Sequence, residues 1–305
     1  MPEHFDPSDA NRIAREYLDS LLLEERIIDA VLPDLTLSLW GEAFASPIMM
    51  PAFSHLKSFG EGRPSGMIEY ALAARNKNLV NWVGMMDNDT YAPIADTGAR
   101  TVRIIKPYAD RGKVFSQIAF AEEHGAFAVG MDTDHVFGYD GRYDVVQGEP
   151  MTCQTTSDIK EYVAATGLPF VIKGVLSVSD AVKCAECGVK GIVVSHHHGR
   201  LPFGIPPLMV LPSIVKALAG SGVKIFVDCS IVSGADVFKA LALGADAVSL
   251  GRGMMPSLTE GGTAGLEEYI KKVTEELATL MGYTGCRDLS APEPSILWRN
   301  GQRLG

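Results

Sequence analysis

The chain has 305 residues, 47% of them hydrophobic, and a formal net charge of −10 at pH 7. This length suffices for one large core, because single α/β barrels commonly occupy about 250 residues. The acidic balance argues against nucleic acid and anionic membrane, both of which select clustered Lys and Arg. The partner expected is therefore a small molecule.

Two further features limit the class of protein. No apolar stretch approaches the ~20 residues of a membrane span, and the first residues lack the basic start and apolar run of a secretory signal. The five cysteines are an odd, scattered set, and the Cys184–Cys187 pair lacks the second half of a zinc site. We therefore expect a cytoplasmic protein with reduced thiols and no metal.

The N-terminal segment, residues 1–46, contains a helix-like stretch over Ala10–Val31. Because the first buried run starts only after it, we expect a helical cap over the floor of the main domain.

From Pro47 onward, short apolar or β-branched runs alternate with helical patterns. Continuous apolar runs between helices indicate parallel strands covered on both faces, and eight of them in strict alternation close most readily into a (β/α)8 TIM barrel. The predicted strands are Ile48–Phe53, Leu79–Gly84, Val102–Lys106, Phe127–Asp132, Phe170–Gly174, Gly191–Ser195, Lys224–Asp228 and Ala247–Gly251.

The barrel is predicted over residues 47–285, and its last outer helix over Leu266–Met281. The longest break follows the fourth strand, over residues 133–155, and long loops on that side of a barrel usually cover an active site. This loop is expected to act as a lid. The end of the chain, residues 286–305, is expected to be a polar tail.

Polar residues stand at the ends of the last four predicted strands, where a barrel brings them to one mouth. They are Lys173, the row His196–His198, Asp228 and the Gly251-Arg252 pair. Small residues after the seventh and eighth strands are typical of phosphate sites in barrels. Backbone N–H groups near Cys229, Ser230 and Gly251, with the guanidinium of Arg252, are therefore predicted to bind a phosphate.

The three consecutive histidines cannot all face one ligand, because side chains alternate along extended chain. One catalytic histidine is expected. A metal cluster with Asp132, Asp134 or His135 stays open as an alternative, as does a Schiff base on Lys173 of the kind barrel aldolases use. Arg200 suits a carboxylate clamp better than an aldol site.

The stretches FVIKGVLSVSDAVKCAECGVKGIVVSHHHGR and FVDCSIVSGADVFKALALGADAVSLGRG resemble the FMN-dependent 2-hydroxy acid oxidases and dehydrogenases, the group of glycolate and lactate oxidase. The resemblance is strong from about Pro169 to Met254 and continues back to SPIMMPAFS. It implies a homo-oligomer, in that family a tetramer, with His197 as catalytic base, Arg200 on the substrate carboxylate and Lys173 facing the flavin. It implies FMN at Pro51, Ala52, Phe53, Gly84, Asp132, Lys173, Asp228, Cys229, Ser230, Gly251 and Arg252.

The chain departs from the family pattern around the substrate and the phosphate. The Asn and Gly that flank the catalytic histidine in the family are His196 and His198 here, and the glycine pair of the DGG motif is Cys229-Ser230. Lys106 stands where the family has a pocket tyrosine, and the N-terminal segment is shorter. We expect weaker FMN binding and an anionic substrate unlike plain lactate, with Lys106 and His196 adding positive charge for a second acidic group.

These patterns together predict an FMN-dependent oxidoreductase that oxidises a small anionic 2-hydroxy acid by hydride transfer to flavin. Three alternatives remain from the sequence: an FMN-dependent reductase or isomerase, a Schiff-base aldolase using Lys173, and a flavin-binding barrel without activity.

Overall fold

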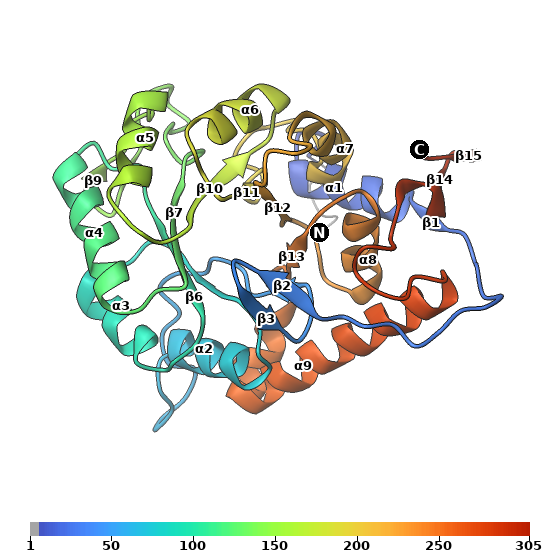
Figure 1. Ribbon diagram of the computed structural model, residues 1–305. Coiled ribbons are helices and arrows are strands. Elements are labelled where there is room, and N and C mark those ends of the chain that lie inside the picture. Colours follow the sequence, from blue (N-terminus) through green and yellow to red (C-terminus); the bar gives the residue numbers. More distant parts are fainter. Residues whose placement is uncertain (1–5) are drawn as a thin grey trace.

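A computed structural model describes residues 6–305, and its centre is a barrel of eight parallel strands (Figure 1). The strands follow one another round the ring in chain order, and parallel bridges from Met49 to Val80 and from Phe53 to Val83 close it. Each strand overlaps one of the predicted runs, so the predicted fold class is confirmed. The strands are β4 (Ile48–Met49), β5 (Asn81–Val83), β6 (Thr101–Ile105), β7 (Ala128–Asp132), β10 (Phe170–Val175), β11 (Gly191–Val194), β12 (Lys224–Val227) and β13 (Ala247–Ser249).

Helices surround the barrel, and side-chain caps begin several of them. Ser177 and Ser233 each accept a hydrogen bond from a backbone N–H in the first turn of the helix that follows. The last helix is bent at Gly262, so the predicted final helix is its second half. The outer helices are α2 (Gly66–Asn76), α3 (Asn88–Ala95), α4 (Arg111–Glu123), α5 (Thr156–Ala164), α6 (Val178–Glu186), α7 (Pro207–Ala217), α8 (Gly234–Ala242) and α9 (Met255–Tyr283), with a 3-10 turn, η1 (Arg252–Met254), before α9.

The first helix is shorter than predicted. Helix α1 covers Ala10–Asp19, and the chain then forms β1 (Leu22–Leu23), which pairs antiparallel with β14 (Leu297–Arg299). The predicted helix over Ala10–Val31 is therefore wrong beyond Asp19. The backbone at Leu22–Leu23 instead pairs with β14, near the other end of the chain, and a local apolar pattern cannot reveal that pairing.

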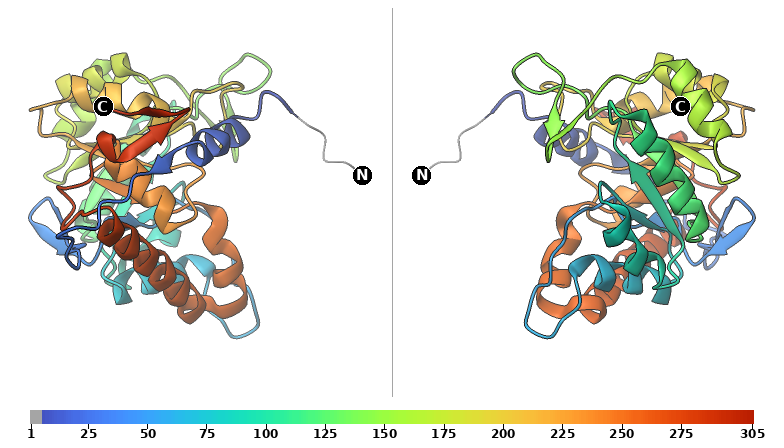
Figure 2. Two further views of the ribbon diagram at one scale, coloured as in Figure 1. Left: turned by 90° about the vertical axis from the view of Figure 1, so that its right-hand side faces the viewer. Right: turned by 90° about the vertical axis from the view of Figure 1, so that its left-hand side faces the viewer.

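Helix α1 also lies at the opposite end of the barrel from the one predicted. Its Asn11 donates from Nδ2 to the carbonyl of His198 at 3.2 Å, and its Arg15 donates from Nη1 to the carbonyl of Ser230 at 2.9 Å. Both carbonyls belong to loops at the C-terminal ends of strands. The helix therefore lies beside the mouth (Figure 2).

A β-hairpin covers the floor instead. It consists of β2 (Leu37–Leu39) and β3 (Glu42–Phe44), and Figure 2 shows it at the end of the barrel away from α1. Trp40 at its turn packs on Phe127 and Phe226, with ring centroids 5.4 and 5.9 Å apart. The cap over the floor is thus a hairpin rather than a helix.

The last residues are not a plain polar tail. Within residues 286–305 the chain forms the 3-10 turn η2 (Pro294–Ile296), β14 and β15 (Gln302–Arg303), and β14 joins β1 and β15 in a small sheet. Leu297 is fully buried there. The expectation of a tail missed this because its apolar residues are few and their partner is at the other end of the chain.

The loop over residues 133–155 folds back on itself near the mouth. It contains the short hairpin β8 (Val145–Val146) and β9 (Glu149–Pro150), and Gln147 at the tip contacts His55 in the loop after β4, with Nε2 atoms 3.2 Å apart. Figure 2 shows this segment in green at the same end as α1. Within the described residues, no helix combines the length and apolarity that crossing a membrane needs.

Candidate active site

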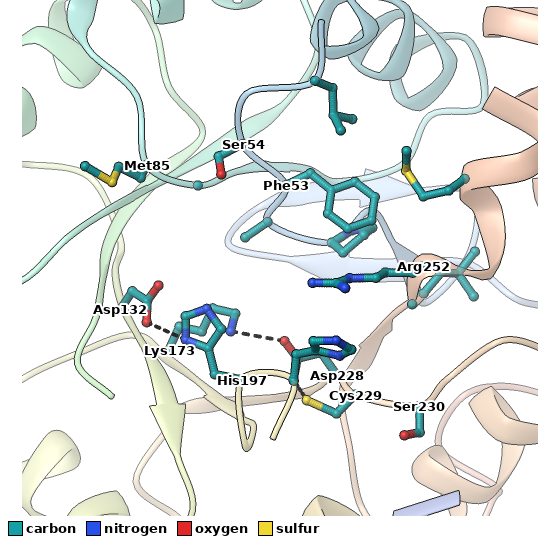
Figure 3. A pocket seen from close by; sticks show the side chains of 18 of the residues that line it. Phe53, Ser54, Met85, Asp132, Lys173, His197, Asp228, Cys229, Ser230 and Arg252 are labelled. Carbon is teal, nitrogen blue, oxygen red and sulfur yellow. Dashed lines mark hydrogen bonds and ion pairs between the residues drawn. The ribbon is translucent and has the colours of Figure 1, made fainter. Parts of the chain in front are cut away.

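A cavity of about 430 Å³ opens at the C-terminal ends of the strands (Figure 3). This volume lies within the ~300–1,000 Å³ range of small-molecule sites. Every residue of the predicted cofactor set lies on its wall, as do Lys106 and His197. Seven wall residues were not predicted: Asn11, Ser54, Leu56, Met85, His198, Leu250 and Met255. Ser54 and Met85 directly follow predicted strands and Leu250 lies within one, so all three could have been found, whereas Asn11 reaches the wall only through the placement of α1.

His197 is held by two carboxylates. Its Nδ1 lies 2.8 Å from Asp134 Oδ1 and 3.1 Å from Asp132 Oδ1, while Nε2 has no hydrogen-bond partner within residues 6–305. Burial by itself lowers the pKa of His197, but the two carboxylates outweigh it and raise that pKa. Since Nδ1–H donates to Asp134, with Asp132 beside it, Nε2 is the nitrogen left to accept a proton.

The two carboxylates differ in their own surroundings. Burial raises the pKa of Asp132, but His197 and Lys106 outweigh it, so that pKa falls well below its usual range. Burial and the charge of Asp132 raise the pKa of Asp134 to about 6. Asp132 is therefore the permanent anion of the pair.

Lys106 occupies the other side of Asp132. Its Nζ lies 2.5 Å from Asp132 Oδ2 and 2.7 Å from His135 Nδ1. Burial, followed by the charges of Lys106 and Arg200, lowers the pKa of His135 to about 4, so this ring is neutral. The ammonium of Lys106 must donate to Nδ1, and Nε2–H of His135 then donates to Asp144 Oδ2 at 3.1 Å.

Ligand atoms of Asp132, His135 and His197 lie within 4.8 Å of one another, the spacing that the metal alternative needs. The ammonium of Lys106 already contacts two of the three. A second cation there would meet strong repulsion. The arrangement favours a protonated network over a metal centre.

Lys173 and Asp228 form a buried ion pair in the middle of the cavity wall. Lys173 Nζ lies 3.3 Å from Asp228 Oδ2 and 3.3 Å from Ser195 Oγ. Burial lowers the pKa of Lys173, but Asp228 and Asp132 outweigh it, so the pKa is raised. A Schiff-base nucleophile must lose its proton, and this environment holds the proton in place.

Arg252 and a set of close backbone contacts form one end of the cavity. The Arg252 guanidinium points into the space in Figure 3 and has no ion pair within residues 6–305. A Cβ at Gly251 would lie 2.8 Å from the carbonyl oxygen of Ile231, so only glycine fits. Cys229 and Ser230 have φ of 72° and 60°, the left-handed region that favours glycine.

At another part of the wall, a Cβ at Gly84 would lie 2.8 Å from the carbonyl oxygen of Ala52. The cavity therefore combines bare backbone at Gly84, a buried ion pair at Lys173 and Asp228, and a free cation at Arg252. These residues fit FMN, which carries a flat ring system and a terminal phosphate.

The structure places Arg200 and His196 away from the cavity wall. Arg200 Nη2 donates to Asp144 Oδ2 at 3.1 Å and to the carbonyl of Phe137 at 3.0 Å, both in the loop over residues 133–155. His196 is 2% exposed, and its Nδ1 accepts from the backbone N–H of Gly199 at 3.0 Å. Burial lowers the pKa of His196, and the ring does not reach the cavity wall, so the structure does not support the prediction that it adds positive charge for the substrate.

The histidine row fails to alternate because the chain leaves extended geometry after β11. His197 and His198 have φ of 46° and 58°, which turns them to the cavity while His196 stays inside. The expectation that the three histidines do not all face one ligand is confirmed, but the backbone turn that brings both His197 and His198 to the cavity is not visible in the sequence.

A barrel with this mouth, and a wall that fits FMN, defines the class of flavin-binding barrels. The family of FMN-dependent dehydrogenases matches residues 6–156 and 139–299. The chain is 28% identical to 4-hydroxymandelate oxidase of Amycolatopsis orientalis over 87% of this chain and 84% of that protein. It is 36% identical to L-lactate oxidase of Roseobacter sp. (strain GAI101) over 52% of this chain, a match that spans 43% of the oxidase.

Among solved structures, a mandelate oxidase variant with a monooxide FMN adduct superposes with a TM-score of 0.85 at 28% identity, over 98% of this chain and 93% of the other. The chain belongs to the FMN-dependent dehydrogenase family, and FMN is its cofactor. This confirms the resemblance read from the sequence.

Proposed function

We propose that this protein oxidises a 2-hydroxy acid, with His197 as the base. The observation that carries the proposal is the His197 ring, whose Nδ1 is held by Asp132 and Asp134 while Nε2 remains available at the cavity wall. The related oxidases of lactate and 4-hydroxymandelate support the substrate class.

FMN would be held by Arg252 at its phosphate, by Asp228 and Lys173, and by the backbone of residues 51–53. When bound, it supplies a hydride acceptor. His197 Nε2 takes the proton of the substrate hydroxyl, and the imidazolium that forms is stabilised by the carboxylates on Nδ1. The Lys173 ammonium stabilises negative charge that develops beside it.

We place the substrate carboxylate at Arg200, one turn beyond the base, which would require the guanidinium to exchange its present partner Asp144 for the substrate. Lys106 lines the cavity but is already paired with Asp132. A role for Lys106 toward a second acidic group predicts that Lys106→Met weakens binding of dicarboxylic 2-hydroxy acids more than of monocarboxylic ones. Equal effects on both would remove that role.

We also propose a cytoplasmic homo-oligomer, a tetramer as the family resemblance implies. Ile28 and Leu32 are 89% and 96% exposed on the segment between β1 and β2, and association of copies would cover them. Sedimentation of the wild type and of an Ile28→Asp/Leu32→Asp variant would test this, since a monomer in both would refute it.

The first experiment is the visible spectrum of the purified protein, followed by anaerobic addition of a panel of L-2-hydroxy acids. We expect flavin bands and bleaching by at least one acid. His197→Asn should keep the bands and lose the bleaching. His124→Asn, at the end of α4 and outside the cavity wall, should retain both. Flavin bands that no acid bleaches would overturn the substrate class.

A further inference from the structure

Three of the cations near His197 already have an anionic partner, which affects how an acid could bind. Arg252 has no such partner within the described residues, and it lies at the end of the cavity assigned to the phosphate. The pairs are Lys106 with Asp132, Lys173 with Asp228, and Arg200 with Asp144. A substrate carboxylate therefore meets no free positive charge there.

Asp144 is a built-in carboxylate partner for Arg200. Its Oδ2 accepts from Arg200 Nη2 and from His135 Nε2, each at 3.1 Å, and its Oδ1 accepts from the backbone N–H of Val145 at 2.9 Å. Burial acts to raise the pKa of Asp144, but the hydrogen bonds from Arg200 and His135 outweigh it and lower the pKa. Asp144 therefore stays ionised at neutral pH.

The position of Asp144 in the chain gives this contact a second consequence. It lies in the loop over residues 133–155, next to β8, and Arg200 also donates to the carbonyl of Phe137 in the same loop. Arg200 is consequently tied to this loop and not to the cavity wall. An acid that takes Arg200 away from Asp144 removes one of these two hydrogen bonds to the loop.

We infer that Asp144 is a specificity-determining residue, whose carboxylate competes with the substrate carboxylate for Arg200. The inference rests on the proposed function in one respect, namely that Arg200 is the carboxylate-binding residue. Its consequence is weak binding of small monocarboxylic 2-hydroxy and 2-oxo acids, because each competes with an internal carboxylate of the same chemistry.

Asp144→Asn removes the negative charge that Arg200 is paired with and keeps the size of the side chain. The matched control is Asp140→Asn, in the same loop. Within residues 6–305, Asp140 accepts only from the backbone N–H of Arg142, so this variant loses the same charge without touching Arg200. Repeating Asp144→Asn in an Arg200→Met background tests whether the effect depends on Arg200.

The readout is the Kd of pyruvate for the FMN-loaded proteins, from the change in flavin absorbance and from calorimetry. Pyruvate is a 2-oxo acid without a hydride to donate, so this binding is measured whether or not any acid is oxidised. Failure of the proposed reaction would appear separately, as flavin that no 2-hydroxy acid bleaches.

We expect Asp144→Asn to lower the pyruvate Kd about tenfold, Asp140→Asn to change it less than about twofold, and the gain to vanish in the Arg200→Met background. An unchanged Kd in Asp144→Asn, the same gain without Arg200, or no pyruvate binding to any of the proteins would each overturn the inference.

Discussion

A substitution at Gly174, at the bend of β10, would disturb the contact between Asp134 and His197. Its φ is +91°, and a Cβ built there would lie 2.3 Å from Asp134 Cγ and 2.5 Å from Asp134 Oδ1. Gly174→Ala must therefore push the Asp134 side chain aside. The displaced group is the carboxylate that now lies 2.8 Å from His197 Nδ1.

Two effects should follow from this substitution. An L-residue in so unusual a backbone conformation costs about 1–3 kcal/mol of unfolding free energy. Loss of one of the two carboxylates that raise the His197 pKa should lower that pKa. Because a base works only when it has lost its proton, the acid limb of kcat/KM should move to lower pH.

The assays are urea unfolding and a pH profile of kcat/KM for the best 2-hydroxy acid. Gly148→Ala is the matched control, since Gly148 has φ of +83° with nothing within 4 Å of an added Cβ. Gly148→Ala should show only the loss of unfolding free energy caused by the backbone conformation, with no change in the pH profile. Asp134→Asn should show the pH shift alone. If Gly174→Ala behaves like Gly148→Ala in both assays, the reasoning about Asp134 is wrong.

Three other substitutions test the cavity. Lys173→Met leaves the Asp228 carboxylate buried without its cation, which should cost about 3–5 kcal/mol of unfolding free energy at pH 7. The unpaired carboxyl then has a raised pKa and takes up a proton as the pH falls, so the deficit should shrink at pH 5, and an equal deficit at both pH values would contradict this. Arg252→Met should weaken FMN about tenfold and leave riboflavin, which has no phosphate, unchanged in a fluorescence titration; equal losses for both would refute the phosphate contact. His198→Gly should raise the unfolding free energy by about 0.5–1 kcal/mol, because a left-handed residue costs about 1–2 kcal/mol and glycine returns part of that as chain entropy. A loss of stability would show that the exposed His198 ring makes a contact worth more than the strain.

Much of the site could be predicted because it depends on local patterns and one topological rule. Buried apolar runs mark the eight strands wherever their partners are, since both faces of a parallel barrel strand must be covered. Once the barrel is assigned, the ends of its strands must meet at one mouth. Lys173, Asp228 and Arg252 therefore came together from sequence alone, and the structure places all three on one cavity wall.

The remaining features depend on contacts between distant segments. Local pattern assigned the chain after Asp19 to a helix, but that chain pairs with a strand nearly 280 residues later. The end of the barrel on which α1 lies is decided by carbonyls of His198 and Ser230 that no periodicity reveals.

The sequence by itself determined the barrel, the family and the residues that could carry charge at the mouth. Only the tertiary structure decided how those charges are paired: that His197 lies between two carboxylates and that Arg200 is bound to the loop over residues 133–155 through Asp144. The physical reason is that residue identity fixes which groups can ionise, whereas the Coulomb energy between them depends on distances that the folded chain alone sets.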